Sequence, residues 1–142
     1  MFESGTYGAI ALDDLDTAEA MLQAKKYNAS VVYSQQAIEK ILKHHLQYFS
    51  GSNVDDLKSH KLLKLAKATG IRELQQFRGQ LSEITDCYFD ARYPGVDYTV
   101  YTIDDAIMYL DVATKIVNIV KGCITSSGRS DGGVSTLNLR IR

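Results

Sequence analysis

Apolar residues recur at intervals of three and four along most of this chain, which is the period of one face of an α-helix. The stripe begins with Leu12, Leu15 and Ala18, and it is cleanest toward the C-terminus, where Leu110 and Ala113 belong to it. The pattern predicts helices over about residues 12–26, 27–49, 60–68, 71–88 and 103–122.

Residues that begin or end helices lie between these segments. Gly70 is a natural C-terminal stop, and Pro94 must break a helix because it lacks a backbone donor. Thr102 to Asp105 fits the capping-box pattern and marks the start of the last helix. Residues 51–59 are predicted to form a loop. Gly79 falls inside a predicted helix, where close packing against another helix would explain it.

Helices joined by short loops pack as antiparallel neighbours, so the fold class expected is all-α, an up-and-down bundle of four or five helices. A chain of 142 residues has the usual length of one domain. We place this domain at residues 1–124 and a flexible tail rich in Gly and Ser at residues 125–142. Because the second and last helices carry more apolar surface than one bundle covers, we expect a homodimer.

Charge and hydropathy exclude several classes of protein. The net charge is −1, which argues against a broad electropositive surface but leaves a local basic pocket possible. No apolar run approaches the roughly 18–20 residues of a membrane span. The first residues are acidic where a signal peptide needs a basic patch, so export is not expected and the predicted location is the cytoplasm.

No motif of a well-known catalytic or metal site is present. Cys87 and Cys123 have no C-x-x-C spacing, and both are expected to be reduced and buried. The chain has no phosphate-binding glycine loop, no zinc-ligand spacing and no Ser-His-Asp arrangement. We therefore predict neither a metal nor a cofactor.

The most unusual segment surrounds Arg92. Five of the nine tyrosines lie within residues 88–109, and Tyr88 and Tyr93 flank this Arg. A guanidinium near a helix end can grip a phosphate through two hydrogen bonds, and Tyr rings can stack on bases. These residues therefore indicate a nucleotide or RNA site. The alternative is structural, with the tyrosines filling the end of the bundle and Arg92 paired with a carbonyl or with Asp86.

His60 is a second candidate, at the start of the predicted third helix. Its imidazole can exchange a proton near neutral pH, but it can equally cap the helix or anchor the loop. His44 and His45 are adjacent and cannot share one helix face, so they make a poor metal site and are interpreted as surface or interface residues.

The second helix also carries polar residues among its apolar ones. They form either a solvated strip or a polar cluster that faces the Arg92 loop. These residues are Gln35, Gln36, Glu39 and Lys40.

The order of these features resembles the HEPN family of small prokaryotic helical domains. The resemblance is carried by Ser34–Lys40 (SQQAIEK), Ser59–Leu63 (SHKLL), Ala91–Pro94 (ARYP) and a last helix that begins with Asp104–Ala106 (DDA). It covers about residues 7 to 122. It implies a helical bundle that dimerises and a function connected with nucleotides or RNA.

Many members of that family are metal-independent endoribonucleases of toxin–antitoxin or defence systems, and others are encoded beside a minimal nucleotidyltransferase that acts as the partner. The ribonucleases carry Arg, four to six residues, then His. In that chemistry the His helps to activate the ribose 2′-hydroxyl and the Arg stabilises the charge on the phosphorus centre. Here Asp97, Tyr98 and Thr99 stand where the His should follow Arg92. The catalytic pattern is incomplete, so whether the protein is an enzyme stays open, with Arg92 and His60 as the candidates.

These observations together predict a domain that binds a nucleotide or an RNA phosphate at the Arg92–Tyr93 loop, as part of a toxin–antitoxin or defence pair with a nucleotidyltransferase. The first alternative is a non-catalytic subunit that docks a partner protein, and the second is a ribonuclease with a non-standard active site. The residues expected to contact the nucleotide are Arg92, Tyr93, Tyr88, His60, Lys40 and Gln36.

Overall fold

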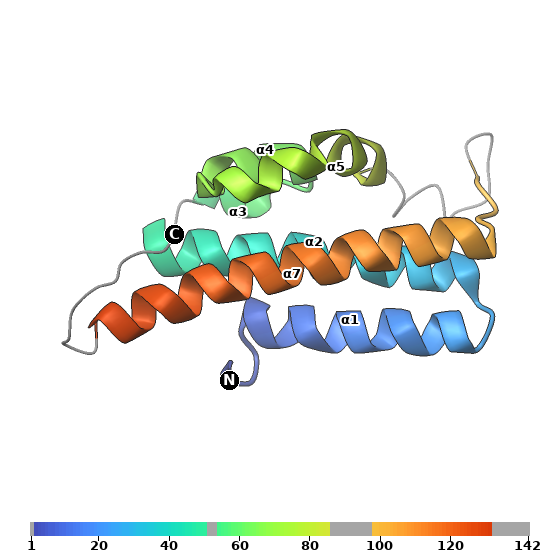
Figure 1. Ribbon diagram of the computed structural model, residues 1–142, viewed down its shortest axis with the longest axis horizontal. Coiled ribbons are helices and arrows are strands. Elements are labelled where there is room, and N and C mark those ends of the chain that lie inside the picture. Colours follow the sequence, from blue (N-terminus) through green and yellow to red (C-terminus); the bar gives the residue numbers. More distant parts are fainter. Residues whose placement is uncertain (1, 51–53, 86–97, 132–142) are drawn as a thin grey trace.

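The computed structural model describes residues 2–50, 54–85 and 98–131, and all regular structure within these ranges is helical. Figure 1 shows long helices on one side and shorter ones stacked above them. The long helices are α1 (Tyr7–Gln23), α2 (Tyr27–Ser50) and α7 (Ile103–Asp131). The short elements are α3 (Val54–Lys58), α4 (Leu62–Thr69), the 3-10 helix η1 (Arg72–Phe77) and α5 (Arg78–Ile84).

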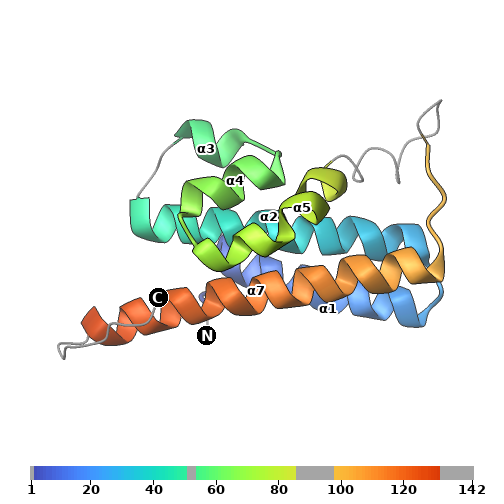
Figure 2. The ribbon, with the colours of Figure 1, turned by 45° about the horizontal axis from the view of Figure 1, so that its top comes forward.

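The long helices lie side by side along the long axis of the molecule. Helix α1 is antiparallel to α2, and α7 runs in the direction of α2 (Figures 1 and 2). Between them in sequence, α4 runs toward the C-terminal end of α2, and η1 and α5 run back, which brings Thr85 next to Leu62 (Figure 2). Helix α2 contacts α1 and α7, and it also contacts α3 and α4 on the side of the short helices. The predicted all-α, up-and-down bundle is confirmed.

The core forms where α2 meets its neighbours. Ile38, Ile41 and Leu42 of α2 are fully buried, as are Ile116 and Val117 of α7. Each buried aliphatic side chain stabilises the fold by about 1.5–3 kcal/mol relative to an exposed one. Because apolar residues lie on more than one face of α2, the helix is covered from two sides.

The N-terminus of α1 is fastened to α2 by His44, whose Nδ1 accepts a hydrogen bond of 2.9 Å from the backbone N–H of Gly8. The ring of Phe2 packs on that of His44, with 4.6 Å between the centroids. A Cβ atom on Gly8 would stand 2.6 Å from Cγ of Phe2, so only glycine fits beneath this ring. His45, on the next face of α2, is 7% exposed. His45 is therefore not a surface residue and His44 is only half-buried, whereas the interface alternative stays a prediction.

Asn28, at the start of α2, holds the segment that leads into α7. Its Oδ1 accepts a hydrogen bond from the N–H of Tyr101 at 2.8 Å, and its Nδ2 donates to the carbonyl of Thr99 at 2.7 Å. The predicted capping box is confirmed, because the N–H of Asp105 donates to Oγ1 of Thr102 while Asp105 accepts from the N–H of Thr102. The start of α7 is therefore fixed by both tertiary and local hydrogen bonds.

The structure differs from the predicted helices in several places. Residues 54–58, expected in a loop, form α3, and α7 continues to Asp131 although we placed the start of the flexible tail at 125. The predicted helix from residue 71 begins as the 3-10 helix η1, since Ile71, Leu74 and Phe77 are spaced by threes, the 3-10 period. A Cβ atom on Gly79 would meet nothing within 4 Å, so close packing does not explain this glycine.

Candidate functional site

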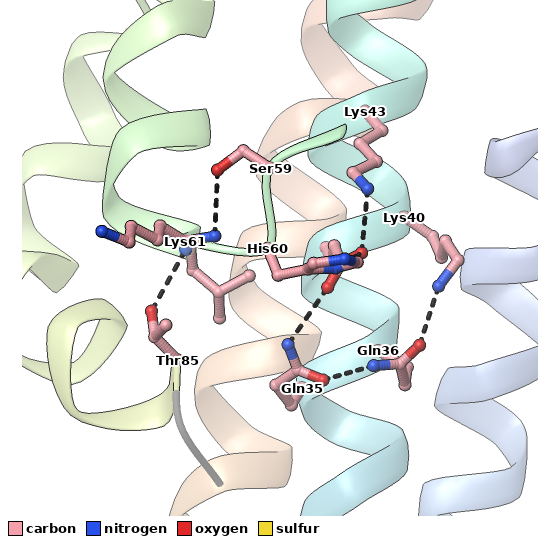
Figure 3. Close-up of polar contacts among 10 residues, drawn as sticks. Gln35, Gln36, Lys40, Lys43, Ser59, His60, Lys61 and Thr85 are labelled. Atoms are coloured by element: carbon pink, nitrogen blue, oxygen red, sulfur yellow. Dashed lines mark hydrogen bonds and ion pairs between the residues drawn. The ribbon is translucent and has the colours of Figure 1, made fainter. Parts of the chain in front are cut away.

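A stripe of polar residues on α2 faces the short helices. Gln35, Glu39 and Lys43 succeed each other at intervals of four, the spacing that places side chains on one face of a helix. They are 1%, 3% and 5% exposed. The solvated strip considered in the sequence analysis is therefore the wrong alternative for Gln35 and Glu39, which belong to a buried polar cluster (Figure 3).

The carboxylate of Glu39 is the centre of this cluster. Its Oε2 accepts from Lys43 Nζ at 3.0 Å and lies 3.1 Å from Nδ1 of His60, while its Oε1 accepts from Gln35 Nε2 at 3.3 Å. Burial by itself raises the pKa of Glu39, but the hydrogen bond and charge of Lys43, the charge of Lys40 and the hydrogen bond from His60 outweigh it. The pKa is lowered overall, so Glu39 is ionised at neutral pH.

The cluster extends from Glu39 across α2 toward α1. Gln36 donates to Gln35, and Lys40 donates to Oε1 of Gln36 at 2.8 Å (Figure 3). Burial raises the pKa of Asp14 on α1, and the charge of Lys40 opposes this increase. Lys40 and Gln36, two of the residues predicted to contact a nucleotide, thus lie in one hydrogen-bonded chain with Glu39.

His60 is the exposed end of the cluster. It lies between α3 and α4, and its side chain is 76% exposed although Nδ1 rests on a carboxylate that is 4% exposed. Because Glu39 is ionised, we assign the proton to Nδ1 of His60, which then donates to Glu39. The ring consequently offers Nε2 to a ligand, as an acceptor when neutral and as a donor when protonated.

The chain that leads to Arg92 leaves the described region close to His60. The backbone N–H of Leu62, two residues after His60, donates to Oγ1 of Thr85 at 3.1 Å. Thr85 follows the last residue of α5. Arg92, Tyr93, Tyr88 and Cys87 lie outside the described residues, so the structure does not test whether Arg92 meets His60.

The other tyrosines and the cysteine that were singled out from the sequence differ in how deeply they are buried. Tyr98 is exposed, whereas Tyr109 is buried and packs edge-on against Tyr101, with 5.7 Å between ring centroids. These two rings fill the end of the bundle, as the structural alternative expects. Cys123 is only partly buried, which differs from the buried position expected for it.

Three residues of the cluster were missed as site residues by the sequence analysis. Gln35 and Glu39 were counted in the polar strip but given no role, and Lys43 was not singled out. The signal that identifies them is the four-residue spacing of Gln35, Glu39 and Lys43 within a helix whose other faces are apolar.

No three His, Cys, Asp or Glu side chains within residues 2–50, 54–85 and 98–131 are placed to hold a metal ion. In the same ranges, no helix combines the length and the apolar character that crossing a membrane requires. Within the cluster the exposed side chain is the imidazole of His60, whereas Lys43 is buried and paired with Glu39.

The fold and the cluster define a small helical domain built around a long central helix with a buried ionic pair. A family model described as the HEPN domain matches residues 8–123. The chain therefore belongs to the HEPN domain family.

Comparison with solved structures agrees with this assignment. The crystal structure of an archaeal HEPN homologue is 25% identical in sequence, covers 83% of this chain and 94% of its own, and superposes with a TM-score of 0.67. No curated protein gives a significant match. The resemblance noted from the SQQAIEK, SHKLL and ARYP segments is confirmed.

Proposed function

We propose that this HEPN domain binds the phosphate of a nucleotide or of RNA at a site formed by His60 together with Arg92 and Tyr93. The observation that carries the proposal is the exposed imidazole of His60, held at 3.1 Å by the buried carboxylate of Glu39. A side chain that is fixed at one ring nitrogen and exposed elsewhere is pre-organised for a ligand. The chain continues from Thr85 toward Arg92. Oγ1 of Thr85 accepts a hydrogen bond from the backbone N–H of Leu62, which lies two residues after His60.

Binding is favoured over cleavage because the residues that follow Arg92 lack the His of the ribonuclease pattern. His60 is then the imidazole available for proton transfer. A non-standard ribonuclease remains the alternative enzyme, and a non-catalytic interaction subunit is the alternative without a nucleotide. A toxin–antitoxin or defence pair with a nucleotidyltransferase is part of the proposal, and family membership is what supports it.

We also propose that the domain is a cytoplasmic homodimer. Ile103 and Ile107 at the start of α7 are both 48% exposed, and Val100, which precedes them, is 76% exposed. Exposed apolar residues at one helix start provide a surface that a second subunit can cover. Light scattering at micromolar concentration should give the mass of two chains, and a monomer would contradict this part of the proposal.

The binding proposal is tested by titrating the purified protein with nucleotides in wild type, Arg92→Ala and His60→Ala. Loss of a hydrogen bond to a charged group costs about 1.5–3 kcal/mol, so each variant should bind about 10- to 100-fold more weakly. Arg72→Ala is the matched control, because Arg72 is an exposed Arg on η1. A wild type that binds no nucleotide, or an equal loss in the control, would overturn the proposal.

The same proteins separate the alternatives. Cleavage of RNA without added metal, lost in His60→Ala, would establish the ribonuclease. The interaction subunit would be established by two results together. Wild type and Arg92→Ala would both associate stably with a nucleotidyltransferase, and neither of them would bind a nucleotide.

A further inference from the structure

Basic residues are concentrated in the segment that contains the short helices. Residues 58–85 include six Lys or Arg and two Glu, whereas the whole chain has a net charge of −1. The rest of the molecule is therefore acidic on balance. A local basic pocket is therefore expected on this segment.

Helix α4 and Lys61, the residue that precedes it, present three of these cations on their outer side. Lys61, Lys64 and Lys67 are all exposed and follow each other at intervals of three, which spreads them over about 9 Å of helix. No ion pair involves any of them within the part of the chain that the structure describes. Their positive charge is consequently available to an external anion.

These lysines border a groove. A hollow of about 520 Å³ is lined by all three and, from the other wall, by Ser82 and Thr85. A second hollow of about 270 Å³ shares Leu63 and Lys67 with the first and extends it to Arg78. We call the two hollows together the α4–α5 groove. It is concave, is bordered by four cations and begins at the residue that follows His60.

We propose that the α4–α5 groove binds the sugar-phosphate backbone of single-stranded RNA. The inference rests on the proposed function, since it specifies that the phosphate at His60 belongs to a strand of several nucleotides. A Lys side chain binds a phosphate as a point charge, so the three lysines supply about three phosphate contacts. No aromatic ring is among the described residues that line the groove, so binding follows phosphate charge and not base identity.

The position of α4 favours RNA over the other common polyanion, an acidic membrane surface. A helix that binds at a membrane inserts an apolar face between the lipids. In α4 that face consists of Leu62, Leu65 and Ala66, which are 0%, 0% and 5% exposed because they pack in the core. The lysines therefore belong to a helix with no apolar face left to insert.

The test measures the binding of a fluorescent oligouridine of about 12 nucleotides at a series of salt concentrations. This length falls within the number of nucleotides that small single-strand binding domains cover. The variant is Lys61→Gln/Lys64→Gln/Lys67→Gln. The control Lys25→Gln/Lys26→Gln/Lys115→Gln removes the same charge elsewhere. Each lost phosphate contact lowers the slope of log K against log salt by about 0.7, so the groove variant should lose about 2 units of slope. Its affinity should fall on the order of 100-fold at about 0.1 M salt, and the control should keep the wild-type slope.

Mononucleotide binding separates this inference from the proposed function. The groove variant should bind a mononucleotide as wild type does, whereas Arg92→Ala should lose that binding and lower the salt slope for the oligonucleotide by only about 0.7, the value of one phosphate contact. If wild type binds mononucleotide but not the oligonucleotide, or if groove and control variants behave alike, the groove inference is overturned and the proposed function stands. Binding to phosphatidylglycerol vesicles in place of the oligonucleotide, lost in the groove variant, would overturn it in favour of a membrane.

Discussion

His44 and His60 use the same ring atom for opposite purposes. Nδ1 of His44 accepts a hydrogen bond from the backbone of Gly8, so this imidazole must be neutral at Nδ1, and burial lowers its pKa. Nδ1 of His60 instead faces the carboxylate of Glu39, which accepts a proton and does not supply one. His44 lies beneath the ring of Phe2, whereas His60 is largely exposed.

The difference separates structure from function on the two sides of α2. On the side of α1, Nδ1 of a half-buried histidine holds the start of α1 against α2. On the side of α4, buried groups hold a histidine whose outer edge is accessible. A buried charge is costly, so a fold that keeps Glu39 and Lys43 where apolar residues would fit has a feature that stability alone does not require.

The largest effect is expected from Glu39→Ala. Removing one partner of a buried ion pair leaves the charge of Lys43 uncompensated and should lower the free energy of unfolding by about 3–5 kcal/mol, measured by urea denaturation. The double variant Glu39→Leu/Lys43→Met removes both charges and should recover most of this loss. If the single and double variants are equally unstable, the cluster acts through packing and the distinction between the two sides of α2 fails.

A smaller loss is expected on the other side, from Gly8→Ala. The new Cβ atom displaces Phe2 from His44, and overpacking of this kind costs about 1–3 kcal/mol, offset in part by the helix propensity of Ala. Gly79→Ala is the matched control, since the Cβ atom enters open space and should stabilise by about 0.5–1 kcal/mol. Thermal unfolding should therefore shift in opposite directions for the two variants, and a shift in the same direction would contradict the packing of Phe2.

Thr102→Ala tests a site remote from both histidines. It removes the side-chain acceptor for the N–H of Asp105 and should cost about 1 kcal/mol, the usual value for an N-cap. Nucleotide binding should not change. A variant that unfolds no more easily than wild type would show that Asn28 alone is sufficient to fix the start of α7.

The smallest effect is that of pH on the wild-type protein. The pKa of His44 is lowered in the fold from its ordinary value of 6.5, so the unfolded chain binds the extra proton first and stability falls as pH decreases from about 6.5. The pKa of Glu39 is also lowered, from 4.5, so its contribution is present above that value and is lost as pH falls further. The urea concentration at the midpoint of unfolding should fall in two steps as the pH of the wild type is lowered, first below about 6.5 and then below about 4.5. The step at higher pH should be absent in His44→Ala.

Most of the fold could be predicted because the residues that determine each helix are close to one another in the sequence. The presence of α2 follows from the period of Val31, Ile38 and Ile41, and the start of α7 follows from Thr102 and Asp105, three residues apart. The 3-10 geometry of η1 was missed although steps of three were visible at Ile71, Leu74 and Phe77. Steps of three and four were treated there as one helical pattern.

The site could be predicted only in part because its contacts join distant residues. Glu39 and His60 are 21 positions apart, and the Gly8–His44 hydrogen bond spans 36. A polar stripe on a helix looks the same in sequence whether it faces water or another helix. His60, Lys40 and Gln36 were selected through family resemblance and residue chemistry, but the burial of Glu39 required the position of α4.

The concentration of cations along α4 has a consequence for how the molecule approaches other molecules. A nearly neutral protein with one positive side and an acidic remainder has a large electric dipole moment. In the field of a polyanion it turns that side forward before any contact forms, which raises the fraction of productive encounters at low ionic strength. Its association kinetics will therefore be those of a basic protein, although its isoelectric point of about 6.3 suggests the reverse.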